Sequence, residues 1–178
     1  MTNEKTWYKA KKQERKEITD FLISMNDETP IPLNSIKGGI ESFLDIWEKE
    51  NNGEILCSKI DNKIIGISQY TFGEPENNYQ NKETGFLKLT IINPKYRNDT
   101  KRTIQLFSKY VEEFSSANFT SIKWTSLKHN NDYINKLYKK FAKVTGECLN
   151  SQQQPGYVWE TTVEKLDKKI KKYSKFIK

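Results

Sequence analysis

The chain has 178 residues, which suits one compact domain and is too short for two ordinary ones. Thirty lysines and arginines against 23 acidic residues give a net charge of +7, which favours an anionic partner such as phosphate, nucleic acid or a membrane surface. No apolar run has the length of a membrane span and the N-terminus lacks a signal-peptide pattern, so we expect a cytoplasmic protein.

The first part of the chain is predicted to form a strand, two helices and a hairpin. An extended piece around residues 7–10 precedes a helix over residues 11–25, where apolar residues recur at helical spacing. Two prolines end that pattern, and a second helix starts at about residue 35. The apolar-rich segments 54–60 and 64–72 are joined by Asp-Asn, which favours a tight turn, so we expect two antiparallel strands.

The second part alternates strands and helices. A polar loop over residues 73–82 separates the hairpin from the next strand, which Pro94 ends. The periodicity predicts, in order, a strand over 86–92, a helix over 101–114, a strand over 121–127, a helix over 132–142, and strands over 144–149 and 157–163. This order predicts an α/β protein with a mixed sheet and no second domain.

The last segment, residues 165–178, is rich in lysine and has apolar residues at helical spacing. We therefore expect one domain over residues 1–164, followed by a lysine-rich helix or tail. A docking or frayed terminal helix is the favoured interpretation, because charge runs usually form a solvated face. An element that binds nucleic acid or a membrane is the alternative.

Side chains with reactive chemistry are few. Cys57 and Cys148 stand far apart without a pairing signature, so we expect reduced, buried thiols. The sequence offers no grouping of metal ligands. His129 is the one histidine and precedes a helix, where a turn or capping role is favoured over catalysis.

Three motifs resemble the GNAT N-acetyltransferase superfamily. The segment Ile92–Arg97 is similar to the family pattern of a β-branched residue, any residue, Pro, two residues, then Arg or Gln. The segment Asn131–Phe141, NDYINKLYKKF, resembles the family helix that opens with Asn and carries a Leu-Tyr pair. The hairpin IDNKIIGISQY is similar to the family's second and third strands, and together the matches cover about residues 53–142.

The resemblance implies a GNAT-like fold, with a mixed, mostly antiparallel central sheet flanked by helices in a single domain. It implies transfer of an acetyl group from acetyl-CoA to a primary amine of a small molecule or a protein. Backbone amides at Ile91 and Ile92 would meet the thioester oxygen where a strand splays or bulges. Tyr138, which matches the family tyrosine, would protonate the leaving thiolate. The implied cofactor-binding residues are Ile91, Ile92, Arg97, Asn98, Asp99, Thr100, Lys101, Arg102, Thr103, Asn131 and Tyr138.

The chain departs from the family pattern at the phosphate-binding loop. Family members carry two small residues after the Arg or Gln, where this chain has Thr100 and Arg102. A helix N-terminus still favours phosphate, and Arg97, Lys101 and Arg102 add positive charge. The β-branched Thr100 nevertheless keeps phosphate farther from the backbone than glycine would. The alternative function is therefore a catalytically inactive GNAT-like binding module, whose basic surface engages nucleic acid or a protein partner.

The remaining roles are open at the level of sequence. Glu83, just upstream of the strand 86–92, and Glu160, in the last strand, are the candidate general bases, against an interpretation of both as surface carboxylates. Tyr138 also falls on the apolar stripe of its helix, which is equally typical of core packing. The sequence names no acceptor amine. Exposed sheet edges are compatible with a monomer or a homodimer.

Overall fold

The computed structural model describes residues 4–29, 32–33, 38–48, 52–97, 99–128, 132–150 and 153–174. The elements expected from the sequence are present over these residues, with bounds that differ from the expected ones by a few residues. In chain order they are β1 (Glu4–Lys9), α1 (Arg15–Ser24), α2 (Gly39–Glu48), β2 (Gly53–Ile60), β3 (Lys63–Phe72), β4 (Thr84–Ile92), α3 (Thr100–Ser116), β5 (Ser121–Leu127), α4 (Asp132–Phe141), β6 (Lys143–Leu149), β7 (Pro155–Thr162) and α5 (Val163–Ser174).

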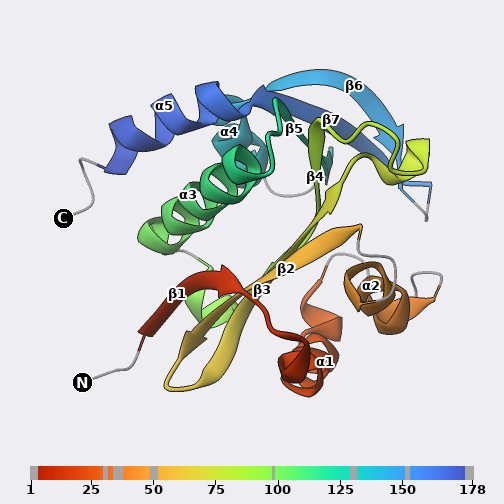
Figure 1. Cartoon of the computed structure of the whole chain (residues 1–178), viewed down its shortest axis with the longest axis vertical. Helices are drawn as coiled ribbons and strands as arrows, with labels where there is room; N and C mark the ends of the chain where they lie inside the picture. Colours follow the sequence, from red (N-terminus) through yellow and green to blue (C-terminus); the bar gives the residue numbers. More distant parts are fainter. Residues whose placement is uncertain are drawn as a thin grey trace.

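The strands form one sheet in the order β1-β2-β3-β4-β5-β7-β6. The neighbours β4 and β5 run parallel, and the other neighbouring pairs run antiparallel. The prediction of a mixed, mostly antiparallel sheet flanked by helices is therefore confirmed. Figure 1 shows the sheet dividing at this parallel pair, with β1 to β4 on one side and β5, β7 and β6 on the other.

The hairpin between β2 and β3 has the turn that its sequence predicts. Asp61 and Asn62 both adopt positive φ angles, of 47° and 63°. Two consecutive residues with positive φ make a type I′ turn, whose twist matches that of the flanking strands. The turn aligns Ile60 with Lys63, and a register shift between Ser58 and Lys59 then changes the pairing along the rest of the hairpin.

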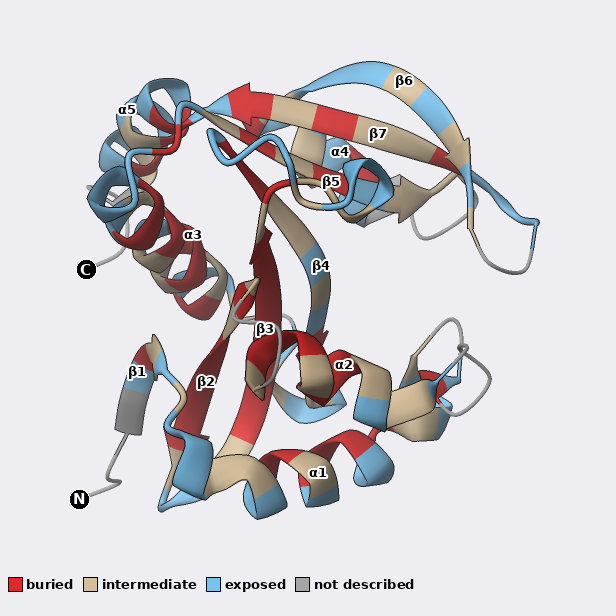
Figure 2. Cartoon of the chain, turned by 45° about the vertical axis from the view of Figure 1, so that its right-hand side comes forward, coloured by how far each residue is buried: buried red, intermediate tan, exposed pale blue. Residues whose placement is uncertain are grey.

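Two apolar clusters cover the two faces of the sheet (Figure 2). Helices α1 and α2 pack over one face around Leu22, Leu44 and Ile67. Helices α3, α4 and α5 pack over the other face around Phe114, Trp124 and Trp159, and Leu166 and Ile170 of α5 are buried there. No helix in the described part of the chain is both long and apolar enough to cross a membrane.

The burial of the two cysteine thiols agrees only in part with the expectation from the sequence. Cys57 of β2 is buried and Cys148 of β6 is half-buried, and both are free. The expectation of burial is right for Cys57. It is too strong for Cys148, because β6 is an edge strand with one neighbour.

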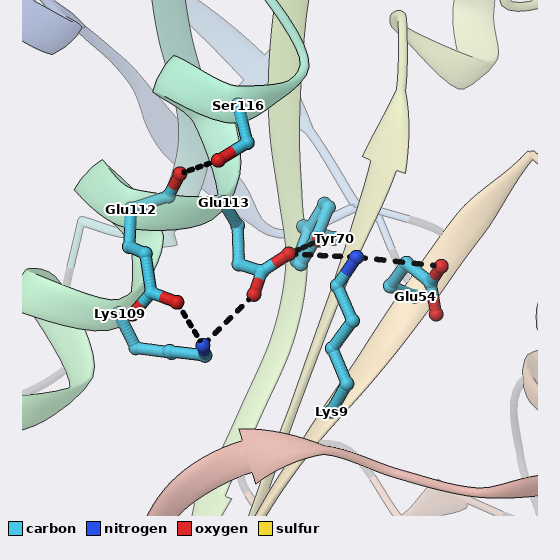
Figure 3. Close-up of polar contacts among 7 residues, drawn as sticks. All are labelled: Lys9, Glu54, Tyr70, Lys109, Glu112, Glu113 and Ser116. Carbon is cyan, nitrogen blue, oxygen red and sulfur yellow. Dashed lines mark hydrogen bonds and ion pairs between the residues drawn. The ribbon is translucent and has the colours of Figure 1, made fainter.

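A charged cluster fastens α3 to the sheet (Figure 3). The Glu113 carboxylate of α3 lies 2.7 Å from the Lys9 ammonium of β1 and 3.0 Å from Lys109, and accepts a hydrogen bond from the Tyr70 hydroxyl at 3.3 Å. Burial alone would raise the pKa of Glu113, but hydrogen bonds from Lys9 and Lys109 outweigh it and hold the pKa below its usual range. The cluster fixes the helix whose N-terminus faces the site described below.

A second charged cluster joins α1 to β2. The Lys59 ammonium, on a side chain that is 9% exposed, lies 2.7 Å from both Glu14 and Glu17. Tyr8 donates a hydrogen bond to Glu14 at 2.8 Å. Burial opposes ionisation of Glu14, but the Lys11 backbone amide, Lys59 and Tyr8 together lower its pKa to about 2.

We expect this cluster to make the fold sensitive to acid. Because the pKa of Glu14 is lower in the folded chain than in the unfolded one, its contribution is present above about pH 4.5 and is lost as the pH falls towards 2. A shift of this size is worth about 3 kcal/mol. Urea unfolding between pH 6 and pH 2 should therefore show a loss of stability that is smaller in Glu14→Gln by about that amount.

The matched control is Glu83→Gln, which changes an exposed carboxyl group in a turn. It should leave the acid dependence of unfolding as in the unmodified chain. If the unmodified chain and Glu14→Gln lost the same stability in acid, the assignment of this acid sensitivity to Glu14 would be contradicted.

Candidate active site

The parallel strands β4 and β5 separate part way along their length. They pair from Thr84 opposite Ser121 to Leu87 opposite Trp124, while β4 continues to Ile92 and β5 to Leu127. We call the point where their pairing stops the fork. Beyond the fork, backbone groups on the facing edges of the two strands are not bonded to each other.

A β-bulge in β4 lies at the fork. Leu87 is opposite Tyr70 of β3 and Leu89 is opposite Gln69, so Lys88 is an additional residue on β4. A bulge of this kind bends the strand and increases its twist. It explains why β4 turns away from β5 directly after Leu87.

The backbone of β4 presents amides towards the open side of the fork. Asn93 donates its amide to the Ile65 carbonyl of β3 at 2.9 Å. Amides of alternate residues point to the same side of a strand, so the Ile91 amide also points to β3, and the Ile92 and Thr90 amides point away from it. Of the two expected oxyanion donors, Ile92 has the suitable direction and Ile91 does not.

Tyr138 stands beside the fork because α4 is anchored to the end of β5. Asn135, which is 8% exposed, accepts a hydrogen bond from Ser126 and donates to the Leu127 carbonyl. One turn later the ring of Tyr138 lies edge-on to Trp124 and Trp159, with centroid distances of 5.3 and 5.8 Å.

The Tyr138 hydroxyl is held protonated at neutral pH. Burial, with a smaller contribution from Tyr110, raises its pKa to about 12. Within the described residues the hydroxyl has no hydrogen-bond partner. Tyr138 therefore both packs in the core and keeps a proton beside the fork, so the two interpretations of this residue are compatible.

Three further hydroxyl groups lie together at the fork, and the sequence did not predict their role there. Ser68 of β3 is hydrogen-bonded to Tyr110 of α3, and it lies 2.7 Å from the Thr90 hydroxyl of β4. The Tyr110 hydroxyl is 3.3 Å from that of Thr90. Burial raises the pKa of Tyr110 to about 12, although both hydrogen bonds oppose the rise. The available signal was the polar Ser68, which is buried on the central strand β3, and Thr90 on the neighbouring strand β4.

The N-terminus of α3 is partly capped by the chain itself. The Asp99 side chain accepts a hydrogen bond from the Arg102 amide at 3.2 Å, which makes Asp99 the N-cap. The amides of Thr100 and Lys101 have no acceptor among the described residues. An anion at this helix end would gain from the helix dipole but would be repelled by the Asp99 carboxylate.

Arg102 is buried in the fold. Its side chain is 4% exposed, donates to the Ser58 hydroxyl of β2 at 2.8 Å, and lies over the Tyr96 ring at 5.6 Å. Its Nε is 3.6 Å from Asp99. These contacts use the guanidinium within the protein, so the geometry does not favour the expected role of this side chain in phosphate binding.

Arg97 is also engaged by the chain. It donates to the Ile92 carbonyl and to the Glu28 carbonyl, both at 2.9 Å, and so ties the short 3-10 helix after α1 (Asn26–Glu28) to β4. Thr103 is half-buried and donates its hydroxyl to the Asp99 carbonyl at 3.3 Å. Lys101 is exposed at the start of α3. Three predicted residues, Asn98, His129 and Asn131, lie outside the described residues.

The two candidate bases lie in different places. Glu83 is exposed in the turn before β4, and its carbonyl accepts hydrogen bonds from the Thr120 and Ser121 amides. At about 3.3 Å per residue, Glu83 is about 16 Å along the strand from Lys88. A base must act within hydrogen-bond reach or through one water molecule, so this geometry speaks against Glu83 for an amine at the bulge.

Glu160 is closer to the fork. It is half-buried in β7 opposite Lys123 of β5, which in turn lies opposite Phe86 of β4. Lys123 is 2.8 Å from Glu74, and this hydrogen bond, with a smaller contribution from Glu160, raises the pKa of Lys123. Glu160 and Glu74 therefore belong to one small charged group around Lys123.

A cavity lies on the opposite face of β4 from α3. Its volume is about 100 Å³, and it is a partly open hollow between α1, α2 and the bulged part of β4. Most of the lining side chains are apolar. The lining residues are Leu22, Leu33, Gly39, Ile40, Ser42, Phe43, Lys88 and Leu89.

Neither a protein-family model nor a curated protein matches the chain. Solved structures do. A GNAT-family acetyltransferase from Streptococcus pneumoniae is similar over 88% of this chain and 98% of its own, with 17% identity and a TM-score of 0.66. An N-acetyltransferase from Staphylococcus aureus Mu50 matches over 90% and 99%, with 18% identity and a TM-score of 0.65.

A chimera of the spermidine N-acetyltransferase SpeG from Vibrio cholerae and hSSAT matches over 90% of this chain and 96% of its own, with 13% identity and a TM-score of 0.64. The architecture of the chain is thus that of the acetyltransferases. Specifically, it is the GNAT fold that the motif Ile92–Arg97 predicts.

Proposed function

We propose that this protein is a cytoplasmic N-acetyltransferase that moves the acetyl group of acetyl-CoA to a primary amine of a small molecule or a protein. The observation that carries the proposal is the fork within a GNAT fold. There β4 and β5 stop pairing, the Ile92 amide points to the open side, and Tyr138 lies next to Trp124. A donor for an oxyanion and a donor for a thiolate therefore meet at one place.

The residues at the fork suit a thioester. Trp124 is 3% exposed, and its indole nitrogen is buried without a hydrogen-bond acceptor in the described part of the chain. A buried donor without a partner is costly, and a carbonyl group of a bound ligand would satisfy it. The fit is poorer at the start of α3, where the Thr100 and Lys101 amides suit phosphate but Asp99 repels it.

In the proposed mechanism, acetyl-CoA supplies an activated acyl group. The Ile92 amide donates to the thioester oxygen and stabilises the negative charge that develops when the amine nitrogen attacks the carbonyl carbon. The carbon–nitrogen bond forms and the carbon–sulfur bond breaks. Tyr138 gives its proton to the departing sulfur and regains one from solvent, and the amine loses its proton to water near Glu160.

A specific observation favours a second candidate, a GNAT-like module without catalysis. Arg102 is buried against Ser58 and Asp99 caps α3, so the phosphate site is weaker than the family pattern implies. Helix α5 carries Lys165, Lys169 and Lys172 along one side, at spacings typical of one helical face. This side would bind a polyanion such as nucleic acid through charge alone.

Thermal unfolding with acetyl-CoA distinguishes the two candidates. The acetyltransferase should melt at a higher temperature with acetyl-CoA at millimolar concentration, because a ligand that binds the folded chain stabilises it. No shift with acetyl-CoA, together with binding of nucleic acid that weakens steeply with salt, would favour the module without catalysis.

The Asp99 carboxylate should weaken binding of acetyl-CoA. Asp99→Asn keeps a good N-cap and removes the negative charge, so calorimetry should show acetyl-CoA binding tighter by about two- to fivefold. Asp20→Asn, which changes an exposed carboxylate on α1, is the matched control and should have no effect. Unchanged or weaker binding in Asp99→Asn would show that phosphate does not approach this helix end.

A further inference from the structure

The cavity beside the bulge has the properties of a binding site for an apolar group. Leu22 and Phe43 are buried, Leu89 is half-buried, and these side chains form walls between α1, α2 and β4. The cavity is reached at the bulge, because Lys88 and Leu89 belong to both features. A group seated in it therefore lies on one face of β4 while the fork opens beside it.

The size of the cavity limits what it can hold. An engineered apolar cavity of about 150 Å³ binds benzene. The volume here is about 100 Å³, which suits a shorter, branched aliphatic group. An apolar group of that size gains from leaving water, and it needs no hydrogen-bond partner inside.

The charge around the cavity limits the ligand further. No carboxylate lines it among the described residues, and the one charged lining residue is Lys88. A second ammonium group inside the cavity would lose its hydration without a carboxylate among these lining residues to offset the loss. The cavity is therefore unsuited to the distal amine of a polyamine such as spermidine, the acceptor for which one structural neighbour is named.

Resting on the proposed function, we infer that the acceptor is a primary amine that carries a short, branched apolar group and no second cation. The apolar group lies among Leu22, Ile40, Phe43 and Leu89. The amine nitrogen then lies outside the apolar walls, beside the fork where the new carbon–nitrogen bond forms.

The test uses binding to the full chain without acetyl-CoA. Isoamylamine and putrescine, one branched and apolar and one dicationic, are titrated separately into protein labelled at leucine and isoleucine methyl groups. Isoamylamine should shift the methyl signals of Leu22, Leu33 and Leu89 at concentrations at least about tenfold lower than putrescine. The difference is expected because burying a small aliphatic group contributes favourable free energy of binding. Equal or tighter binding of putrescine, or shifts confined to methyl groups that do not line the cavity, would overturn the inference.

Two substitutions with matched controls confirm the site. Ile40→Trp fills the cavity and should abolish the isoamylamine shifts, whereas Ile23→Trp, at a position 59% exposed on α1, should preserve them. Lys88→Glu should bring putrescine binding closer to that of isoamylamine, and Lys63→Glu, at the exposed start of β3, should not. Isoamylamine binding that survives Ile40→Trp would place the ligand elsewhere and refute the assignment.

Failure of this inference is distinguishable from failure of the proposed function. Acetylation of putrescine in preference to isoamylamine would leave the acetyltransferase intact and refute the acceptor class. Preferred binding of isoamylamine in the cavity by a chain that does not bind acetyl-CoA would uphold the site and refute the acetyl transfer.

Discussion

Tyr138→Phe is expected to lower kcat by about 100-fold or more while leaving acetyl-CoA affinity nearly unchanged, because it removes one proton donor and keeps the ring. The ring contacts with Trp124 and Trp159 do not involve the hydroxyl. The hydroxyl has no hydrogen-bond partner within the described residues, so its loss should cost little stability. Steady-state kinetics with isoamylamine, with calorimetry of acetyl-CoA binding, measures both quantities.

Tyr157→Phe is the control. The Tyr157 ring also contacts Trp159, at 5.9 Å, but it lies on β7 and not on α4. Tyr157→Phe should have a kcat within about twofold of that of the unmodified chain, because the lost hydroxyl group does not act in the reaction. Equal turnover in the unmodified chain and Tyr138→Phe would remove Tyr138 as the acid and leave it a core residue.

Replacement of Arg102 by alanine is expected to lower the free energy of unfolding by about 3 kcal/mol, because it removes a buried, hydrogen-bonded side chain and leaves a cavity. The Ser58 hydroxyl, which is fully buried, would lose the Arg102 donor. Arg102→Met fills most of the same space without charge and should restore much of the loss. Urea unfolding of the two variants tests this order.

The methionine variant also tests the role of Arg102 towards phosphate. If the guanidinium serves the fold, acetyl-CoA should bind Arg102→Met as it binds the unmodified chain. A hydrogen bond to a charged group is worth about 1.5–3 kcal/mol, so a phosphate contact would instead cost tenfold or more in affinity. A stable Arg102→Met with affinity lowered by that factor would contradict the structural role.

The fold could be predicted because its signals are local. The Asp61-Asn62 turn joins β2 and β3, and Pro94 follows the end of β4, as expected. The motif Ile92–Arg97 also identifies the strand that forms the fork. Each signal depends on residues within a few positions of one another, where spacing and turn chemistry determine the structure.

The site was harder to predict because its partners are distant in sequence. Arg102 has the charge of a phosphate ligand, but its hydrogen-bond partner Ser58 lies 44 residues earlier. The hydroxyl groups of Ser68 and Tyr110 are 42 positions apart and meet only when α3 packs on the sheet. Glu83 appears close to the strand in sequence, yet it lies at the end away from the bulge. These contacts in space cannot be predicted from residue type and spacing along the chain.

Release of free thiol from acetyl-CoA tests the central claim most directly. The purified chain is mixed with acetyl-CoA at millimolar concentration and isoamylamine, and a thiol reagent follows the liberated CoA. We expect release that is proportional to protein concentration, requires the amine, and falls by about 100-fold or more in Tyr138→Phe. Release no faster than the background without protein, for isoamylamine, putrescine and spermidine alike, would contradict the assignment of acetyl transfer to the fork.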